Sequence, residues 1–221
     1  MTHTVHPYAH RLGILRDWKS RWFSADPKRY REFLRCDTVV KALLEKNLRG
    51  MYVSSIEVER SRKTLRVIVK TSRPGLIIGR SGGGSARIKS DIERAIKKLK
   101  LTEAPEVKLD IEEVRSPESH APIVGAMVSE GLEKRMPFRR VLKQAVEKVM
   151  ANRDVKGVKI SISGRLGGAE MSRREVIKKG RVPLQTFRAD IDYAVVKAFL
   201  PYGVIGIRVW IYRGDVFSKE K

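Results

Sequence analysis

Apolar residues in the first third of the chain recur at spacings that predict a helix followed by two strands. Residues 1–27 contain few periodic apolar positions and are expected to form an extended arm. A helix is predicted to begin after Asp26, a possible N-cap followed by proline, and to stop at Gly50. Apolar and polar residues then alternate over 52–60 and 63–71, which is typical of two strands joined by a short turn.

The next segment combines a short apolar helical turn, a glycine-rich loop and a long helix. Residues 74–78 precede the run Gly79-Arg80-Ser81-Gly82-Gly83-Gly84. Apolar residues three and four apart then predict a long helix, at Ile88, Ile92, Ala95, Ile96 and Leu99. A further strand is predicted from Val107 to Val114. The order strand, short helix, Gly-x-x-Gly, long helix, strand is the minimal KH arrangement, and the helix and strand before it fit the form with an N-terminal extension.

Beyond Ser116-Pro117, the best candidate for a linker, the pattern predicts a second region. In chain order it predicts helices at 118–135 and 137–152, a strand at 158–162, a basic excursion at 165–181, a strand at 182–188, a helix at 190–199 and a strand at 205–212. We therefore expect an α+β chain, with a type II KH domain carrying an N-terminal helix-strand extension, and a C-terminal α/β domain of helices packed on a mixed sheet. The expected divisions are an arm at 1–27, the KH domain at 28–115 and the C-terminal domain at 118–217.

The charge balance narrows the class of partner. Lys and Arg number 47 against 25 Asp and Glu, which gives a formal net charge of +22. Such an excess indicates a polyanionic partner, either nucleic acid or an anionic membrane. No apolar run approaches the ~20 residues of a spanning helix, no stretch resembles a signal peptide, and the single Cys36 suits a reducing compartment as a small buried hydrophobe. We expect a cytoplasmic protein that binds nucleic acid without membrane contact.

The Gly-x-x-Gly loop, formed by Gly79, Arg80, Ser81 and Gly82, is the first candidate for an RNA-binding site. KH domains clamp about four backbone nucleotides over this loop. Glycines without a Cβ let the sugar-phosphate chain approach the peptide backbone, and N–H groups at the start of a helix favour phosphate. A nucleotide P-loop fits less well because it needs Lys-Ser or Lys-Thr where Ser85-Ala86 stand, and a dinucleotide fingerprint would follow a strand directly.

Several short motifs along the chain resemble one family. They are Val5-His6-Pro7, Arg11 to Ile14, Arg73 to Gly79, Phe138-Arg139-Arg140, Ser163 to Glu170, Gly180 to Leu184, Arg188 to Tyr193 and Tyr202 to Gly206. Together they resemble the bacterial form of ribosomal small-subunit protein three, the KH-containing protein of the subunit head. The resemblance implies a structural protein of the small ribosomal subunit, with 16S-type rRNA, mRNA and neighbouring head proteins as partners. It also implies a place at the entrance through which mRNA reaches the decoding site, and a part in unwinding structured mRNA.

Two further basic sets are candidates for RNA contact. Arg139, Arg140 and Lys143 fall outside the apolar stripe of the helix at 137–152, at spacings that place them on one face. Matching positions in the family line the mRNA entrance, so the resemblance implies that these residues bind message phosphates. A glycine-flanked basic region is expected to contact rRNA through Arg165, Gly167, Gly168, Arg173, Arg174, Lys178, Lys179 and Arg181. Ser81 departs from the family, which commonly has two basic residues between the loop glycines, as does Gly83-Gly84 in place of a polar pair.

No residue set has the pattern of a catalytic or metal site. The sequence shows no nucleophile–base pair and no paired carboxylates in glycine-flanked loops. His6 and His10 are four apart, but Pro7 between them is incompatible with a helix, and no Cys or carboxylate completes a ligand set. We expect no enzymatic activity, no cofactor, no metal and no small-molecule substrate. Two alternatives stay open: a nucleic-acid-processing enzyme such as a nuclease or lyase, and a free KH-type regulator of mRNA.

Overall fold

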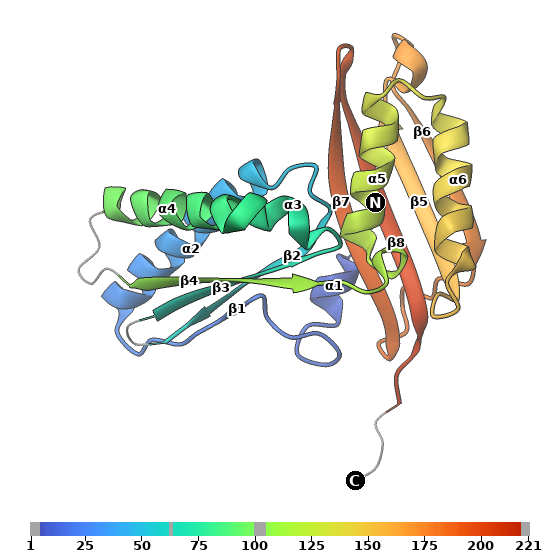
Figure 1. Cartoon of the computed structure of the whole chain (residues 1–221). Helices are drawn as coiled ribbons and strands as arrows, with labels where there is room; N and C mark the ends of the chain where they lie inside the picture. The colour runs from blue at the N-terminus through green and yellow to red at the C-terminus, as the bar shows by residue number, and fades with distance from the viewer. Residues whose placement is uncertain (1–4, 62–63, 100–104, 218–221) are drawn as a thin grey trace. The chain divides into compact units, whose positions relative to one another are not determined.

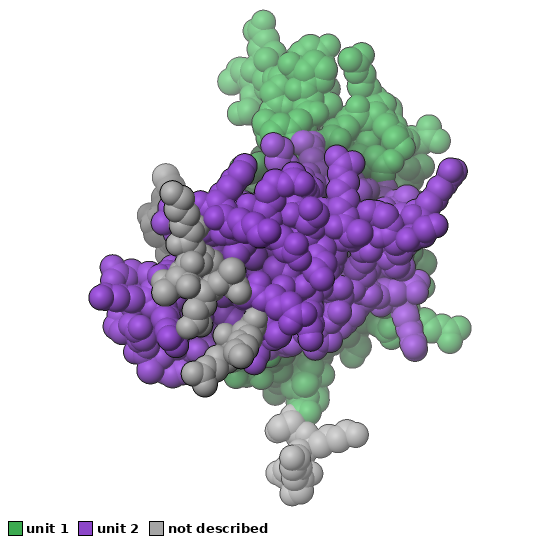
Figure 2. All heavy atoms as spheres, turned by 60° about the vertical axis from the view of Figure 1, so that its left-hand side comes forward, with its two compact units in different colours: residues 1–17, 116–221 green, residues 18–115 purple. Residues whose placement is uncertain are grey.

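The chain forms two compact units, which Figure 2 colours separately. The computed structural model describes residues 5–61, 64–99 and 105–217. Unit 1 comprises residues 1–17 together with 116–221, and unit 2 comprises residues 18–115. The N-terminal segment therefore belongs to the same unit as the C-terminal half of the chain.

Unit 2 is a four-stranded sheet with helices packed against it (Figure 1). In chain order its elements are β1 (Ser20–Arg21), α2 (Pro27–Asn47), β2 (Val53–Arg60), β3 (Thr64–Thr71), α3 (Pro74–Ile78), η1 (Arg80–Gly82), α4 (Gly83–Lys98) and β4 (Glu106–Glu113). The sheet order is β1-β2-β3-β4, with β2 and β3 antiparallel, β1 parallel to β2, and β4 parallel to β3. The order of elements confirms the predicted KH arrangement with its N-terminal helix and strand.

Local chemistry sets the boundaries of α2. The Asp26 carboxylate accepts a hydrogen bond from the backbone N–H of Lys28 at 2.9 Å, and Pro27 occupies the first helical position. The helix ends at Asn47, shortly before Gly50, whose φ of +83° lies in the left-handed region that favours glycine. The predicted start and stop of this helix are therefore confirmed.

Unit 1 is a second four-stranded sheet, covered on one face by two helices that lie side by side (Figure 1). Its elements are α1 (Pro7–His10), η2 (Pro117–Ser119), α5 (Ala121–Glu133), α6 (Phe138–Ala151), β5 (Gly157–Gly164), η3 (Leu166–Gly168), β6 (Arg173–Gly180), β7 (Ala189–Leu200) and β8 (Gly203–Asp215). The sheet order is β6-β5-β8-β7. Buried aliphatic side chains from α5, α6 and the helix-facing sides of all strands except the edge strand β6 form the core.

Four expectations for this unit were wrong. The predicted helix at 190–199 is the long strand β7, the predicted strand at 182–188 is not a strand, and the basic excursion contains the strand β6. Every strand pair in this unit is antiparallel, whereas a mixed sheet was expected. Ile191, Ala194 and Ala198 satisfy a helical spacing, but the β-branched Val195 and Val196 and pairing along the whole of β8 favour the strand.

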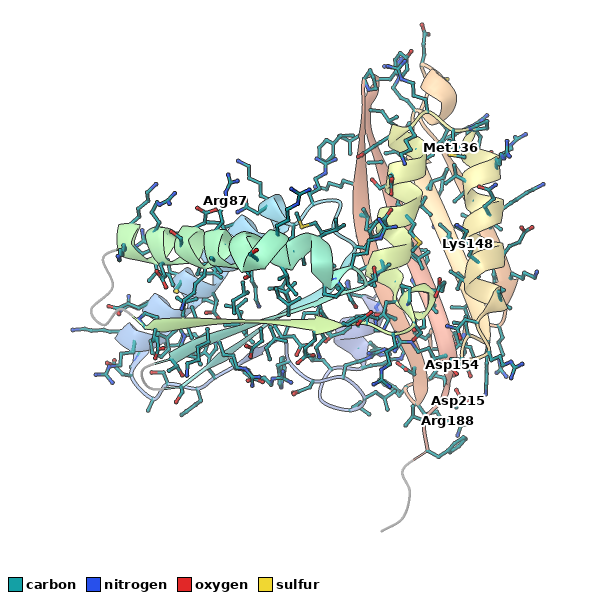
Figure 3. The ribbon with its side chains drawn as sticks, in the orientation of Figure 1. Arg87, Met136, Lys148, Asp154, Arg188 and Asp215 are labelled. Atoms are coloured by element: carbon teal, nitrogen blue, oxygen red, sulfur yellow. The ribbon has the colours of Figure 1, made fainter. Side chains whose placement is uncertain are left out.

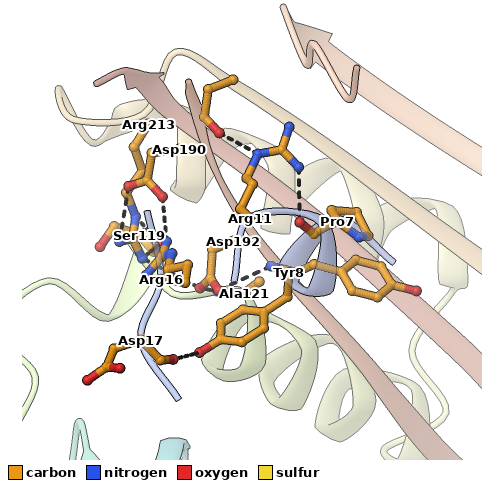
Figure 4. A network of polar contacts seen from close by, with 12 residues as sticks. Pro7, Tyr8, Arg11, Arg16, Asp17, Ser119, Ala121, Asp190, Asp192 and Arg213 are labelled. Atoms are coloured by element: carbon orange, nitrogen blue, oxygen red, sulfur yellow. Dashed lines mark hydrogen bonds and ion pairs between the residues drawn. The ribbon is translucent and has the colours of Figure 1, made fainter. Parts of the chain in front are cut away.

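The predicted arm at 1–27 is neither extended nor a separate body in its described part. Residues 1–4 lie outside the described residues, as do residue 62 of the predicted turn and residue 63 of the second predicted strand. Pro7–His10 form α1, and Arg11 is fully buried against β7 (Figure 4). The Arg11 guanidinium donates to the carbonyls of Ala189 at 2.6 Å and Thr186 at 2.8 Å, among others. Because the carbonyls around Thr186 bind this guanidinium, the segment 182–188 does not join the sheet.

A cluster of charged residues holds the start of α5 to the same end of the sheet (Figure 4). The Asp192 carboxylate accepts a hydrogen bond from the Ala121 N–H at 2.8 Å, and Arg213 donates to the Ser119 carbonyl at 2.7 Å. Arg16 forms an ion pair with Asp190 at 2.6 Å. These contacts fix the helix layer and the N-terminal segment on β7 and β8.

Candidate nucleic-acid interface

The Gly-x-x-Gly loop is an exposed bend that leads directly into α4. Gly79 and Gly82 have φ of +70° and +77°, and Ser81 between them has φ of +52°. Arg80 and Ser81 are exposed. The N-cap Gly82 provides no side-chain cap for α4, and the Gly83 N–H donates to the Arg80 carbonyl, so the positive end of the helix lies beside the Arg80 charge. The structure thus brings the four predicted loop residues together in one exposed bend at the start of α4.

Gly84 also belongs to this site, although from the sequence it stood out only as a difference from the polar pair that is usual in the family. A Cβ at this position would press into the Ile77 carbonyl oxygen and lie 3.0 Å from that of Ile78. The first turn of α4 therefore packs directly on the backbone of α3, which holds both ends of the loop. The sequence signal for this close packing was the fourth glycine among residues 79–84, because a merely flexible loop does not need a glycine inside the helix that follows it.

The predicted trio on α6 does share an exposed face. Arg139, Arg140 and Lys143 are all exposed, while the opposite side of the helix enters the core through Val141, Leu142, Val146 and Val149. The Arg139 side chain is 71% exposed and lies 3.8 Å from the Glu175 carboxylate of β6. Such an exposed ion pair contributes little stability and is readily exchanged for another anion.

The predicted rRNA-binding residues do not form one patch. Successive residues of β6 point to opposite faces of the sheet, so the side chains of Arg173 and Lys179 lie on the helix-covered side, whereas those of Arg174 and Lys178 lie on the other. Arg173 comes within 5.4 Å of the Phe138 ring, which Arg139 also approaches at 5.6 Å. Arg173, at one end of the predicted rRNA-binding region, therefore lies close to Arg139 of the α6 trio.

The glycine loop between β5 and β6 has structural contacts of its own. Arg165 donates to the carbonyls of Ala169 at 2.8 Å and Tyr202 at 3.4 Å. Gly167 and Gly168 have φ of +69° and +81°, so glycine is favoured at both positions by the turn itself. Lys178, Lys179 and Arg181 are exposed at the far end of the strand.

Three basic residues that share a face with Arg174 and Lys178 were missed. Lys159 of β5, Arg208 of β8 and Lys197 of β7 lie on that face, as the strand register shows. The period-two spacing of the aliphatic residues Ile207, Val209 and Ile211 was the signal that Arg208 points away from the core.

In the described part of the chain, no group of three His, Cys, Asp or Glu side chains is placed to hold a metal ion, and no helix is long and apolar enough to cross a membrane. His6 accepts a hydrogen bond from the Ala9 N–H at its Nδ1 and packs edge-on against Tyr193 at 4.6 Å. Burial raises the pKa of the Cys36 thiol, which disfavours the reactive thiolate.

Comparison with known proteins decides the family. The family described as "Ribosomal protein S3, C-terminal domain" matches residues 128–211, and the family described as "KH domain" matches residues 40–119. The small ribosomal subunit protein uS3 of Caldicellulosiruptor saccharolyticus is 41% identical over 220 residues, which covers all of this chain and 96% of that protein. The chain belongs to the uS3 family. The uS3 proteins of Coxiella burnetii strain RSA 493 and Legionella pneumophila strain Lens are 45% and 42% identical, with 93% and 97% of their lengths covered.

Membership of the uS3 family makes this chain a structural protein of the small ribosomal subunit and not an enzyme. The alternative of a nuclease or lyase is therefore wrong. The KH domain and the C-terminal domain of the family correspond in sequence to the two sheets described above. With its net charge of +22, a uS3 protein of this composition has RNA as its natural partner.

Proposed function

We propose that this uS3 protein forms part of the mRNA entrance of the small subunit, with Arg139, Arg140 and Lys143 binding phosphates of the incoming message. The observation that carries the proposal is the exposure of three cations on one face of α6. The other face of α6 is anchored in the core, so the three charges are held by a rigid support. Charged side chains on such a support act as fixed contacts that position a nucleic-acid strand without reading its sequence.

A fixed row of cations also explains how the protein assists the opening of base-paired message. Phosphates held at the entrance keep the incoming single strand apart from its complement, which favours the opened form of a hairpin as each base pair is drawn in. Arg139 and Arg173, both near the Phe138 ring, extend the row from α6 to the edge strand β6. Glu175 between them lowers the local potential without neutralising it, because a single carboxylate faces two guanidiniums.

The KH loop and the basic edge complete the proposed RNA contacts. The loop residues Gly79 to Gly82 are proposed to hold the sugar-phosphate backbone through the N–H groups at the start of α4. The remaining basic residues of the region 165–181 are proposed to contact 16S-type rRNA, and neighbouring head proteins are the expected protein partners.

The test compares ribosomes that carry a triple alanine variant at Arg139, Arg140 and Lys143 with ribosomes that carry the native chain. Translation is timed on an unstructured message and on a message with a stable hairpin downstream of the decoding site. The variant should slow about two- to tenfold on the hairpin alone, the effect of losing ~0.5–1.4 kcal/mol at exposed contacts. Its unfolding free energy should stay within about 0.5 kcal/mol of the native value.

The matched control replaces three other exposed cations of the same unit by alanine: Lys134, Lys148 and Arg153. Lys148 lies on the same helix (Figure 3). This control should translate both messages at the native rate. Equal slowing of the trio variant on both messages, or none on either, would remove the trio from the entrance.

A further inference from the structure

The face of the unit 1 sheet opposite α5 and α6 is uncovered over most of its length. Residues paired across neighbouring strands point to the same face, and alternate residues along a strand share it. We call this set the open face. It comprises Arg174, Val176 and Lys178 of β6, Lys159, Ser161 and Ser163 of β5, Val204, Gly206, Arg208 and Trp210 of β8, and Tyr193, Val195, Lys197 and Phe199 of β7.

The open face carries charge of one sign. All of its positions lie in the described part of the chain, and among them Lys159, Arg174, Lys178, Lys197 and Arg208 are basic while none is Asp or Glu. Four of these five cations are exposed, and Lys159 is half-buried. Like charges across a sheet repel one another, so this arrangement is unfavourable unless an anion neutralises it.

Two of these cations are held in place by neighbours on the same face. The Nε of Arg174 donates a hydrogen bond of 3.0 Å to the hydroxyl of Ser161, which is buried beneath it. This bond engages Nε, whereas a bidentate contact with phosphate can use the terminal nitrogens. The Lys159 ammonium lies 5.0 Å from the centre of the Trp210 ring. Cations held in this way lose little conformational entropy when they bind an anion.

The two ends of the open face differ. At one end Tyr193 and Trp210 pack against the N-terminal segment and the region around Val182, so this end is closed. At the other end Phe199 and Val204, which pair across β7 and β8, are 52% and 49% exposed, and Val195, which is 54% exposed, lies beside Arg208 in the middle of the face. The exposed cations therefore share the face with exposed apolar side chains, on a surface that can take both the phosphates and the sugar or base of a polynucleotide.

We propose that the open face binds the phosphate backbone of RNA in the small subunit, with Arg174, Lys178, Lys197 and Arg208 as its main contacts and Lys159 in support. An acidic protein surface would match the same charges, but RNA is favoured because the whole chain, and not this face alone, carries a large positive excess. The inference rests on the rRNA contact proposed above and places its centre on the sheet face, away from the glycine loop at Arg165.

The first test measures binding of the full chain to a transcript of small-subunit rRNA over a range of salt concentrations. The double variant Lys178→Gln with Arg208→Gln is compared with Lys148→Gln with Arg153→Gln, an exposed Lys–Arg pair from α6 and the residues after it. We expect the first to bind about 10-fold more weakly and with a salt slope reduced by about 1–2, since each lost phosphate contact removes roughly 0.7–0.9 from the slope. The second should bind within about twofold of the native chain.

Equal losses in the two double variants would overturn the open face as a binding surface while leaving rRNA binding itself intact. A native chain that does not bind the transcript at all would instead overturn the proposed rRNA contact, and the open face with it. Both double variants replace exposed residues, so their unfolding midpoints should match that of the native chain.

The second test identifies what lies on the open face. Cys36 is fully buried and is the chain's one cysteine, so a Val195→Cys variant can be labelled there with a photo-crosslinker and assembled into subunits. Crosslinks to rRNA are the expected result. Crosslinks to protein alone would show that this face docks a neighbouring protein, and no crosslink to either would show that it stays open; each would overturn the proposal.

Discussion

Two consecutive glycines at the start of α4, Gly83 and Gly84, occupy opposite environments. Gly83 has ordinary helical φ and ψ of −61° and −32°, and a Cβ there would meet no heavy atom within 4 Å. Gly84 packs on the Ile77 and Ile78 carbonyls. Gly83→Ala should therefore stabilise unit 2 by about 0.5–1 kcal/mol, because alanine restricts the unfolded chain and favours the helix.

Gly84→Ala should destabilise the same unit by roughly 1–3 kcal/mol, because α4 must move away from α3 to admit a methyl group. Chemical unfolding of the two variants measures both values in one series. The Gly84 variant should also lose affinity for single-stranded RNA, while the Gly83 variant keeps it. Equal stability of the two variants would show that α4 can shift without cost and that the tight packing is not needed to hold the loop.

At the scale of elements, one ionic row ties three strands of unit 2 together. Glu57 of β2 accepts a hydrogen bond from Arg21 of β1 at 2.6 Å and lies 3.0 Å from the Lys70 ammonium of β3. Burial by itself raises the pKa of Glu57, but hydrogen bonding and charge from Lys70, with Arg21 adding to them, outweigh it and leave the pKa below its ordinary value. The Glu57 carboxylate therefore stabilises the folded unit at neutral pH.

That stabilisation should disappear in acid. A carboxyl group with a lowered folded-state pKa contributes stability above its unfolded pKa of about 4.3, and loses it as pH falls through the folded value. Glu57→Gln should destabilise unit 2 by about 1 kcal/mol at pH 7 and by much less near pH 2. The exposed Glu113→Gln serves as the control, with little effect at either pH. If the Glu57 variant lost as much stability near pH 2 as at pH 7, the ionic row would not be the cause.

Elements whose local signals agreed with their tertiary pairing could be predicted from sequence. In unit 2 the cap at Asp26, the alternation of apolar and polar residues in β2 and β3 and the stripe from Ile88 to Ile96 all favour the structure that forms. β7 could not be predicted in this way, because its helix-like spacing is overridden by pairing with β8. The shared exposed face of the trio on α6 was predictable from helical periodicity, whereas its place at the mRNA entrance came from the family resemblance and stays a prediction. The open face was not, since two of its four strands, β6 and β7, were expected to be a basic excursion and a helix.

At the scale of the whole molecule, Arg11 joins the beginning of the chain to its C-terminal half. Its buried guanidinium donates to carbonyls of Pro7, Leu184, Thr186 and Ala189. Burial lowers the pKa of this group, and the nearby Asp190 carboxylate opposes the shift, so the charge is retained. No local sequence pattern predicted that Arg11 binds these carbonyls, because all but one of its partners are more than 170 residues away.

Arg11→Met should destabilise unit 1 by roughly 2–4 kcal/mol, because buried carbonyls lose their donor. Unit 2 has its own core and should keep its stability. Hydrogen exchange separates the two effects: amides of β7 and β8 should exchange faster, while those of β2 and β3 should not change. The exposed Arg153→Met is the control and should change neither set. Faster exchange in both sheets would contradict the independence of the two units.

The split composition of unit 1 has a consequence for the order in which a newly made chain can fold. Residues 18–115 contain all of unit 2 and can collapse as soon as they leave the ribosome that synthesises them. The N-terminal segment emerges earlier, yet its docking surface, formed by the region around Thr186 and by β7, is made only after unit 2 and is completed when β8 pairs with β7. At a synthesis rate of roughly 5–20 residues per second, the partners of Arg11 are complete only on the order of ten seconds after unit 2. During that interval the aromatic and basic residues before Asp17 are accessible to chaperones or to RNA. Their exposure ends when β8 completes the sheet on which they dock.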